Sequence, residues 1–223
     1  MPSITVEDYV KNLFLLQQRS EDDDVRVPMG HLATAMSVVP GTATTMAKTL
    51  ADAGLADYAP RAGVRLTDNG RALALHMLRR HRLVEQFLVE TLGLDWSEVH
   101  DEAERLEHAI SDRVLDRIDT LLGHPETDPH GAPIPTAKGG FTRASSQPLS
   151  SCKADAQVHI VRVPDEDPDF LNYLKLNGLL PGARLTITAH DPHAAAWTVS
   201  VADHVDLTLG TRAADRIQVA PRD

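Results

Sequence analysis

Apolar side chains recur at helical spacing along the first part of the chain. The spacing predicts a helix over residues 4–19, a short helix opened by Pro28, and a third helix from about Pro40 to Gly54. Residues 55–66 then favour two short strands around a turn. Three helices followed by a hairpin are typical of a winged helix-turn-helix.

Three more helices are expected downstream of the hairpin. They cover residues 68–92, residues 96–111, and a shorter stretch that ends at Leu122 before Gly123. Asp95 and Glu98 have the spacing of a capping box for the second of these helices. The apolar side chains of these three helices leave enough uncovered surface for the interface of a homodimer.

The pattern changes again after residue 123. Residues 124–151 hold five prolines, which is the composition of a linker. Short β-type runs follow at 158–163, 184–189, 197–201, 205–209 and 217–219, with a helix over 169–176. The fold class expected is therefore mainly α with a small β domain, a C-terminal β-barrel. The domain boundaries expected are 1–70 (winged helix-turn-helix), 71–124 (helical domain), 125–151 (Pro-rich linker) and 152–223 (β domain).

Composition narrows the class of protein. The chain has 223 residues, 42% of them hydrophobic, but no uninterrupted apolar run near the ~20 residues of a membrane-spanning helix. The N-terminus lacks the pattern of a signal peptide. The single cysteine, Cys152, excludes an intrachain disulfide and fits a reducing compartment. We therefore expect a cytoplasmic protein with no membrane partner.

The charge is unevenly distributed. The whole chain carries −10, yet residues 25–82 hold eight basic and three acidic side chains and carry +5. A positive segment on an acidic protein can bind phosphates while the acidic remainder opposes loose association with nucleic acid. A small helical subdomain with no DNA partner remains the alternative from pattern alone.

Histidines and carboxylates are concentrated on the two helices that follow the hairpin. Those at shared helical faces are His81, Glu85, His100, Glu104, Glu107 and His108. Each residue taken singly is more often structural. Together, imidazoles and carboxylates on adjoining helices favour a site for a first-row divalent metal.

A family resemblance rests on these same segments. Residues 80–85 (RHRLVE), 93–95 (GLD) and 99–108 (VHDEAERLEH) resemble the metal-binding signature of the diphtheria-toxin-repressor family. Residues 132–135 (APIP) are similar to the family's Asn-Pro-Ile-Pro, and the resemblance covers the whole chain. It implies a dimeric, metal-dependent transcriptional repressor with a winged helix-turn-helix, a helical dimerisation domain and a C-terminal SH3-like domain.

The resemblance also implies two metal sites. The primary site would comprise Asp8, Glu104, Glu107 and His108. Iron- and toxin-type members hold Met and Cys at the positions of Asp8 and Glu104, and replacing sulfur ligands by oxygen shifts preference toward Mn²⁺. Lys11 stands where short manganese-type members carry a second acid, which speaks against a binuclear site of their kind.

The family resemblance also implies a second, ancillary metal site and a set of DNA contacts. The ancillary site would comprise His81, Glu85 and His100, completed from the C-terminal domain by Glu166 and Asp169. The candidates for DNA contacts are Thr42, Thr44, Thr45 and Lys48 on the recognition helix and Arg61 and Arg65 in the wing.

The resulting hypothesis is a homodimeric, Mn²⁺-responsive repressor that binds operator DNA, controls genes of metal homeostasis and has no small organic substrate or catalytic activity. The nearest alternative is Fe²⁺ as the effector, with Co²⁺ or Zn²⁺ acting in vitro. A metallohydrolase would use His81, Glu85 and His108 as ligands and Glu107 as base, but the sequence has no HExxH motif. A metal-independent winged-helix regulator is the third possibility.

Overall fold

The computed structural model describes residues 3–20, 22, 25–142, 145–201 and 206–221. The chain divides into two compact units, one formed by Met1–Arg80 with Pro135–Phe141 and the other by His81–Ile134 with Thr142–Asp223. Among the described helices, none is long and apolar enough to cross a membrane.

The first unit contains three helices, a hairpin and the beginning of a fourth helix. These are α1 (Ile4–Gln17), α2 (Met29–Ala35), α3 (Pro40–Asp52), β1 (Ala56–Ala59), β2 (Gly63–Leu66) and α4 (Asp68–Glu90). The side chain of Ser3 caps α1 by accepting from the N–H of Val6, and Pro40 occupies the first turn of α3. Leu13, Phe14 and Leu50 are buried between these helices and form the centre of the core.

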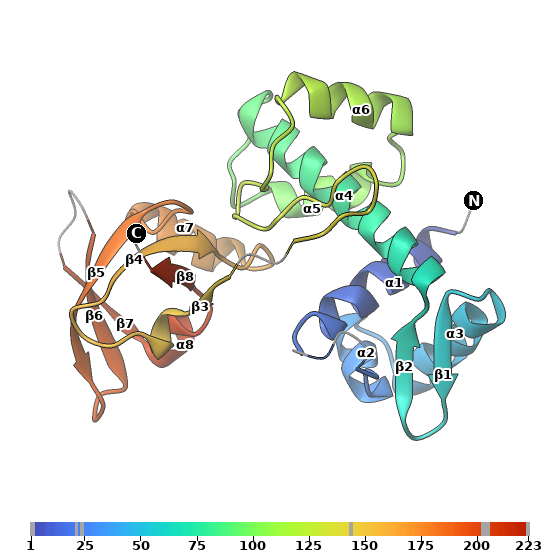
Figure 1. Cartoon of the computed structure of the whole chain (residues 1–223), viewed down its shortest axis with the longest axis horizontal. Coiled ribbons are helices and arrows are strands. Elements are labelled where there is room, and N and C mark those ends of the chain that lie inside the picture. The colour runs from blue at the N-terminus through green and yellow to red at the C-terminus, as the bar shows by residue number, and fades with distance from the viewer. Residues whose placement is uncertain (1–2, 21, 23–24, 143–144, 202–205, 222–223) are drawn as a thin grey trace. The chain divides into compact units, whose positions relative to one another are not determined.

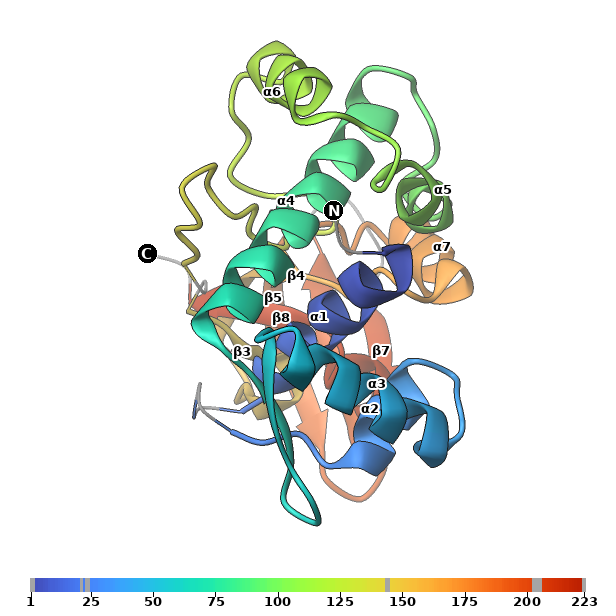
Figure 2. The same cartoon turned by 90° about the vertical axis from the view of Figure 1, so that its right-hand side faces the viewer.

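The hairpin is the wing of this unit. β1 and β2 are antiparallel, with Ala56 opposite Leu66, and the hairpin extends away from α1–α3 in both views (Figures 1 and 2). Arg61, at the turn, has a φ of 66°. The sequence prediction of three helices and a hairpin in the winged helix-turn-helix order is confirmed.

The second unit begins with the C-terminal half of α4, flanked by α5 (Val99–Leu106) and α6 (Asp112–Leu121) (Figures 1 and 2). α5 is shorter than the expected helix over 96–111, and its N-cap residue, Glu98, makes no side-chain cap. The expected capping box is wrong because the carboxylate of Asp95 accepts instead from the N–H of Ser97, at 3.0 Å, and from Lys175 Nζ, at 2.5 Å.

The rest of the second unit is a small β domain. It contains β3 (Gln147–Pro148), the 3-10 helix η1 (Leu149–Ser151), β4 (Gln157–Arg162), α7 (Pro168–Leu176), β5 (Arg184–Asp191), β6 (Ala196–Val201), β7 (Leu207–Gly210), α8 (Thr211–Ala214) and β8 (Gln218–Pro221). The strand order is β3-β8-β4-β5-β6-β7. The mainly α class with a small β domain is confirmed, but no pairing among the described residues joins β3 to β7, so the sheet is not closed as the expected barrel.

Some details of the β domain differ from the sequence prediction. The sequence did not predict β3 or α8, and Val205, the first residue of the expected strand 205–209, lies outside the described residues. Cys152 is buried, and Gln147 Nε2 donates to its Sγ at 3.5 Å.

The Pro-rich segment 125–151 is not a free linker. Residues 126–134 form a tight hairpin, in which Asp128 N–H donates to Ala132 O at 3.0 Å and Ile134 N–H donates to Glu126 O at 2.8 Å. We call this hairpin the clasp. Residues 135–141 belong to the first unit, where Phe141 packs edge-on against Phe14 with ring centroids 5.5 Å apart. The four domain boundaries predicted from the sequence remain a prediction.

The ion pair between Asp95 and Lys175 leads to a pH prediction. Lys175, with help from the N–H and hydroxyl of Ser97, lowers the pKa of Asp95 to about 2. A carboxyl with a lowered folded-state pKa stabilises the fold above its unfolded pKa, and this contribution is lost as pH falls from about 4 to about 2. We expect Lys175→Gln to raise the pKa of Asp95 toward 3.8, as measured by NMR titration of the side-chain carboxyl. A wild-type titration curve in the variant would contradict the assignment of Lys175 as the main cause.

Candidate metal centre

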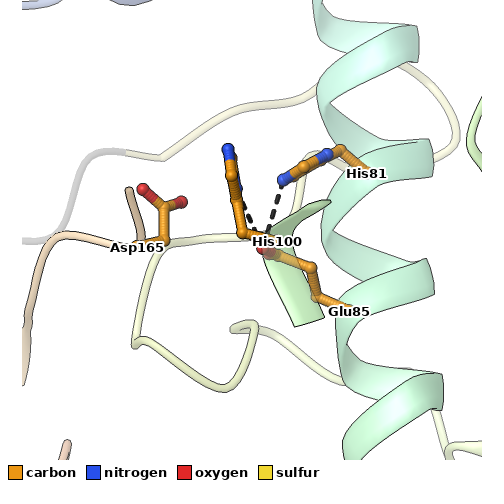
Figure 3. A group of neighbouring side chains, drawn as sticks. All are labelled: His81, Glu85, His100 and Asp165. Carbon is orange, nitrogen blue, oxygen red and sulfur yellow. Dashed lines mark ion pairs between the residues drawn. The ribbon is translucent and has the colours of Figure 1, made fainter. Parts of the chain in front are cut away.

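Two neighbouring elements and one loop bring imidazoles and carboxylates together in the second unit. His81 and Glu85 are one turn apart on α4, and His81 Nε2 lies 3.1 Å from Glu85 Oε1. His100, in the first turn of α5, places Nδ1 3.5 Å from the same oxygen. Asp165, from the loop between β4 and α7, completes the group, in which all four ligand atoms lie within 4.8 Å of one another (Figure 3).

The carboxylate that the β domain brings to this group is Asp165, whereas the resemblance implied Glu166 and Asp169. Among the described residues, neither Glu166 nor Asp169 joins any group with metal-ligand spacing, and both are exposed. Asp169 lies in the first turn of α7, beyond the loop that approaches Glu85. Asp165 precedes these two residues by one and four positions, and the membership of Glu166 and Asp169 in the ancillary site remains a prediction.

A second set of ligand atoms surrounds Glu85 from the clasp. Asp128, His130 and Asp165 form a group with Glu85, and His130 Nδ1 lies 3.9 Å from Glu85 Oε1. His130 is fully buried, and its Nε2 is 2.8 Å from the carbonyl oxygen of Trp96. Because a carbonyl only accepts, Nε2 carries the proton, and in the neutral ring the lone pair on Nδ1 faces Glu85.

Sequence reasoning missed Asp128 and His130. The density of prolines indicated a linker, and a linker is expected to carry exposed side chains. The signal available in the sequence was an Asp-x-His triplet inside that segment, a spacing that can place two ligands on one turn.

Several polar atoms of this centre are buried without an aligned hydrogen-bond partner. Both carboxylate oxygens of Glu85 have none, and neither has Nδ1 of His100 or of His130. A buried polar group without a partner costs about 1–3 kcal/mol. Metal–donor distances of about 2.0–2.2 Å put neighbouring donors about 3–4 Å apart, and the separations of 3.1, 3.5 and 3.9 Å around Glu85 Oε1 match this. The residues present thus fit a divalent cation.

Burial and charge act in opposite directions on the pKa values of the centre. Burial disfavours the ionised form of Glu85, but His81 and His100 keep the pKa of its carboxyl below the ordinary value. Burial, reinforced by the charge of Glu85, raises the pKa of Asp128 to about 6. Although burial opposes protonation of His100, the Glu85 carboxylate raises its pKa. Of these two carboxyls, Glu85 is the one whose ionised form its surroundings favour.

A third group lies on the other side of His81. His81 Nδ1 is 2.6 Å from Glu107 Oε2 and 3.5 Å from Glu104 Oε1, and these three residues also have metal-ligand spacing. His108 Nε2 is 3.4 Å from Glu107 Oε1. Glu107 is the C-cap of α5 and is buried. His108 follows it directly in the turn after the helix. Asp8 is on α1 in the first unit, and its membership of the primary site remains a prediction.

The residues expected to contact DNA occupy α3 and the wing. Thr42, Thr45 and Lys48 are exposed, and Thr44 is half-buried. The hydroxyls of Thr44 and Thr45 donate to the carbonyls of Pro40 and Gly41, at 2.8 and 3.1 Å. Phosphate oxygens only accept, so these hydroxyls must turn away from the helix before they can bind one, whereas their methyl groups need no such change.

The two wing arginines differ in their surroundings. Arg61 is exposed at the turn of the hairpin. Arg65 Nε donates to Asp57 Oδ2 at 3.2 Å, and the same oxygen also accepts from Arg26, at 2.5 Å. Arg61 is therefore the better candidate for a phosphate or minor-groove contact.

Comparison with known proteins agrees with this architecture. Residues 67–136 match the model of the iron dependent repressor metal binding and dimerisation domain, and residues 147–221 match the FeoA domain. The iron-dependent repressor IdeR of Mycobacterium leprae is 29% identical over 227 residues, which cover 96% of each chain. The diphtheria toxin repressor of Corynebacterium efficiens is 42% identical over 96 residues, 43% of this chain and 41% of the relative.

A solved structure extends the likeness to the whole chain. A manganese-dependent transcriptional repressor in complex with manganese is 41% identical, with a TM-score of 0.89, and the match covers 97% of this chain and 100% of that one. The winged helix-turn-helix, the carboxylate–histidine groups and these matches define a metal-dependent transcriptional repressor. The chain belongs to the iron-dependent repressor, or diphtheria toxin repressor, family and carries its FeoA-type C-terminal domain.

Proposed function

We propose that this protein is a homodimeric repressor whose binding to operator DNA is activated by Mn²⁺, and that it acts in the cytoplasm on genes of metal homeostasis without catalysing a reaction. The observation that carries the proposal is the fully buried Glu85, which is surrounded by His81, His100, His130 and Asp165 and has no aligned hydrogen-bond donor. Such a cluster is costly without a cation and stable with one.

Two sites are assigned to the metal. The first surrounds Glu85 and Asp165, which would hold the cation either with His81 and His100 or with the clasp residues Asp128 and His130. The second is the primary site of the resemblance, comprising Asp8, Glu104, Glu107 and His108. A bound cation neutralises the carboxylates and fixes their positions.

In this proposal, Asp8 couples the binding of metal to the binding of DNA. Asp8 lies on α1, whose buried face, including Leu13 and Phe14, belongs to the core of the DNA-binding unit. A ligand on this helix lets the metal select an orientation of the DNA-binding unit relative to the dimerisation helices. Metal that favours the DNA-competent state must raise DNA affinity, and DNA must raise metal affinity by the same factor.

Oxygen and nitrogen ligands support Mn²⁺ over Fe²⁺ as the effector. The described residues of both sites offer carboxylates and imidazoles, and the single cysteine, Cys152, is in none of the groups with metal-ligand spacing. Hard oxygen donors suit Mn²⁺, which gains less from sulfur ligation than Fe²⁺ does. The likeness to a manganese-dependent repressor points the same way, whereas the likeness to IdeR keeps Fe²⁺ as the alternative.

The test is a titration of DNA binding by metal. The metal-free protein is mixed with fluorescent operator DNA, and anisotropy is followed while Mn²⁺ or anaerobic Fe²⁺ is added. We expect Mn²⁺ to raise affinity by a factor of about 5–150, the usual range for coupled sites. Tight binding without metal would contradict the proposal, and equal activation by Fe²⁺ would contradict selectivity for Mn²⁺.

The same assay tests the recognition helix. Replacing both Thr44 and Thr45 by alanine removes two methyl groups and two hydroxyls from α3, and we expect the preference for operator over unrelated DNA to fall by about tenfold or more, since a base contact is worth about 1–3 kcal/mol. The control is Thr34→Ala on α2, where the hydroxyl also donates to a carbonyl four residues back. Unchanged discrimination would show that α3 is not the recognition helix.

A further inference from the structure

The tip of the clasp is a fixed turn. Asp128 Oδ1 accepts from the N–H groups of His130 and Ala132, both at 2.9 Å, and Gly131 N–H donates to Asp128 O at 3.0 Å. On the α4 side, Arg82 Nη1 donates to Pro133 O at 2.5 Å. These bonds therefore fix the backbone position of His130, and the bond from its Nε2 to Trp96 O orients the ring.

The same tip lies directly against β4. Gly131 has a φ of 85°, and a Cβ built on it would lie 2.0 Å from the carbonyl oxygen of Val161. Next to this contact, Val163 N–H donates to His130 O at 3.0 Å. Val161 lies where the register between β4 and β8 shifts, between Ile160 and Arg162. Such a bulge changes the direction of a strand, and here it occurs where the strand meets the clasp.

This contact joins the two segments that deliver ligands to Glu85. His130 immediately precedes Gly131, and Asp165 follows Val163 by two residues. The backbone separation at Gly131 and Val161 thus determines how far apart these two ligands lie. We propose that Gly131 is a positioning residue for the metal site at Glu85, because only a residue without a side chain lets the clasp and β4 approach closely enough for His130 and Asp165 to share a cation. The inference rests on the metal site of the proposed function.

The chain contains a matched control for the conformation of Gly131. Gly182 lies in the same unit and has a φ of 84°, but a Cβ at that position would meet nothing within 4 Å. Alanine at either position carries the same cost of a positive φ. Only alanine at Gly131 collides with backbone.

The experiment measures binding of Mn²⁺ alone to the full chain, by calorimetry and by loss of the free-ion electron paramagnetic resonance signal. We expect Gly131→Ala to weaken the site at Glu85 by about 10- to 100-fold, the usual effect of losing groups that orient metal ligands. We expect Gly182→Ala to bind as the wild type does. Equal affinities in the two variants would overturn the proposal.

A double-mutant cycle separates positioning from general destabilisation. With His130→Gln, the ligand that Gly131 positions is already lost, so Gly131→Ala should cost much less affinity in that background than in the wild type. The same loss in both backgrounds would show that Gly131 acts on the fold and not on His130, and would overturn the proposal.

A second variant covers the case in which Gly131→Ala does not fold. Val163→Pro removes the N–H that bonds to His130 O and leaves Gly131 intact, and it should weaken the same site. Wild-type affinity in Val163→Pro would overturn the proposal. These experiments measure metal binding without DNA. If the separate operator assay showed no activation by metal, the proposed function would be contradicted but this inference would still stand.

Discussion

Replacement of Glu85 by glutamine is expected to lower the affinity for Mn²⁺ by more than about 100-fold, since loss of outer groups alone costs about 10- to 100-fold. Glu85 is common to both groups of ligand atoms that the structure forms around it, one with His81 and His100 and one with the clasp. The amide keeps the shape of the side chain but removes the charge that attracts a cation and balances the surrounding imidazoles.

Calorimetry with Mn²⁺ on metal-free protein measures this effect. Glu90→Gln is the control, because Glu90 is on the same helix but exposed, and it is outside every group with metal-ligand spacing that the described residues form. The operator assay adds a second measurement, in which the glutamine variant at position 85 should need correspondingly more Mn²⁺ for DNA binding. Wild-type affinity in that variant would remove Glu85 from the metal site.

Replacement of Asp8 by alanine should abolish the response to metal without abolishing assembly. Asp8 is the one proposed ligand that belongs to the first unit, so its loss should uncouple that unit from the metal while Glu85 and its neighbours still bind Mn²⁺. The enhancement of operator affinity by Mn²⁺, expected to be about 5–150-fold in the wild type, should fall to about one.

Three measurements on the Asp8 variant are needed together. Sedimentation should give the same dimer as the wild type, calorimetry should retain binding at Glu85, and anisotropy should show no activation by Mn²⁺. Glu7→Ala, one residue away on α1, serves as the control. Metal-dependent DNA binding at wild-type strength would refute the coupling role of Asp8.

Most of the secondary structure could be predicted from the sequence because its signals are local. The stripe of apolar residues in α1, Pro40 at the start of α3 and the positive φ of Gly123 after α6 each depend on neighbours a few residues away. Where a distant residue competed, the prediction was wrong. The helix expected over 96–111 begins only at Val99, because the Asp95 side chain binds Ser97 and Lys175 instead of capping a helix.

The candidate site shows the same division. Histidines and acids at helical spacing identified His81, Glu85, His100, Glu104, Glu107 and His108 as neighbours, and the structure brings them together in the second unit. Asp128 and His130 were missed because a high proline content indicates irregular backbone but does not show which residues the segment packs against. Asp165 was not among the candidates, because several acids lie close together in this stretch of the chain and only the folded backbone determines which of them approaches Glu85.

The sequence by itself determined most of the helices and strands, the winged order of the first unit and the chemical type of the candidate metal ligands, because periodicity, turn residues and side-chain chemistry are properties of short segments. The tertiary structure alone decided which acid of the loop before α7 turns toward Glu85, and that a Pro-rich segment supplies a buried histidine to the same place. The clasp and β4, the strand that leads to this loop, are far apart in the sequence and meet at the close approach of Gly131 to Val161. Local sequence patterns carry no information about such contacts.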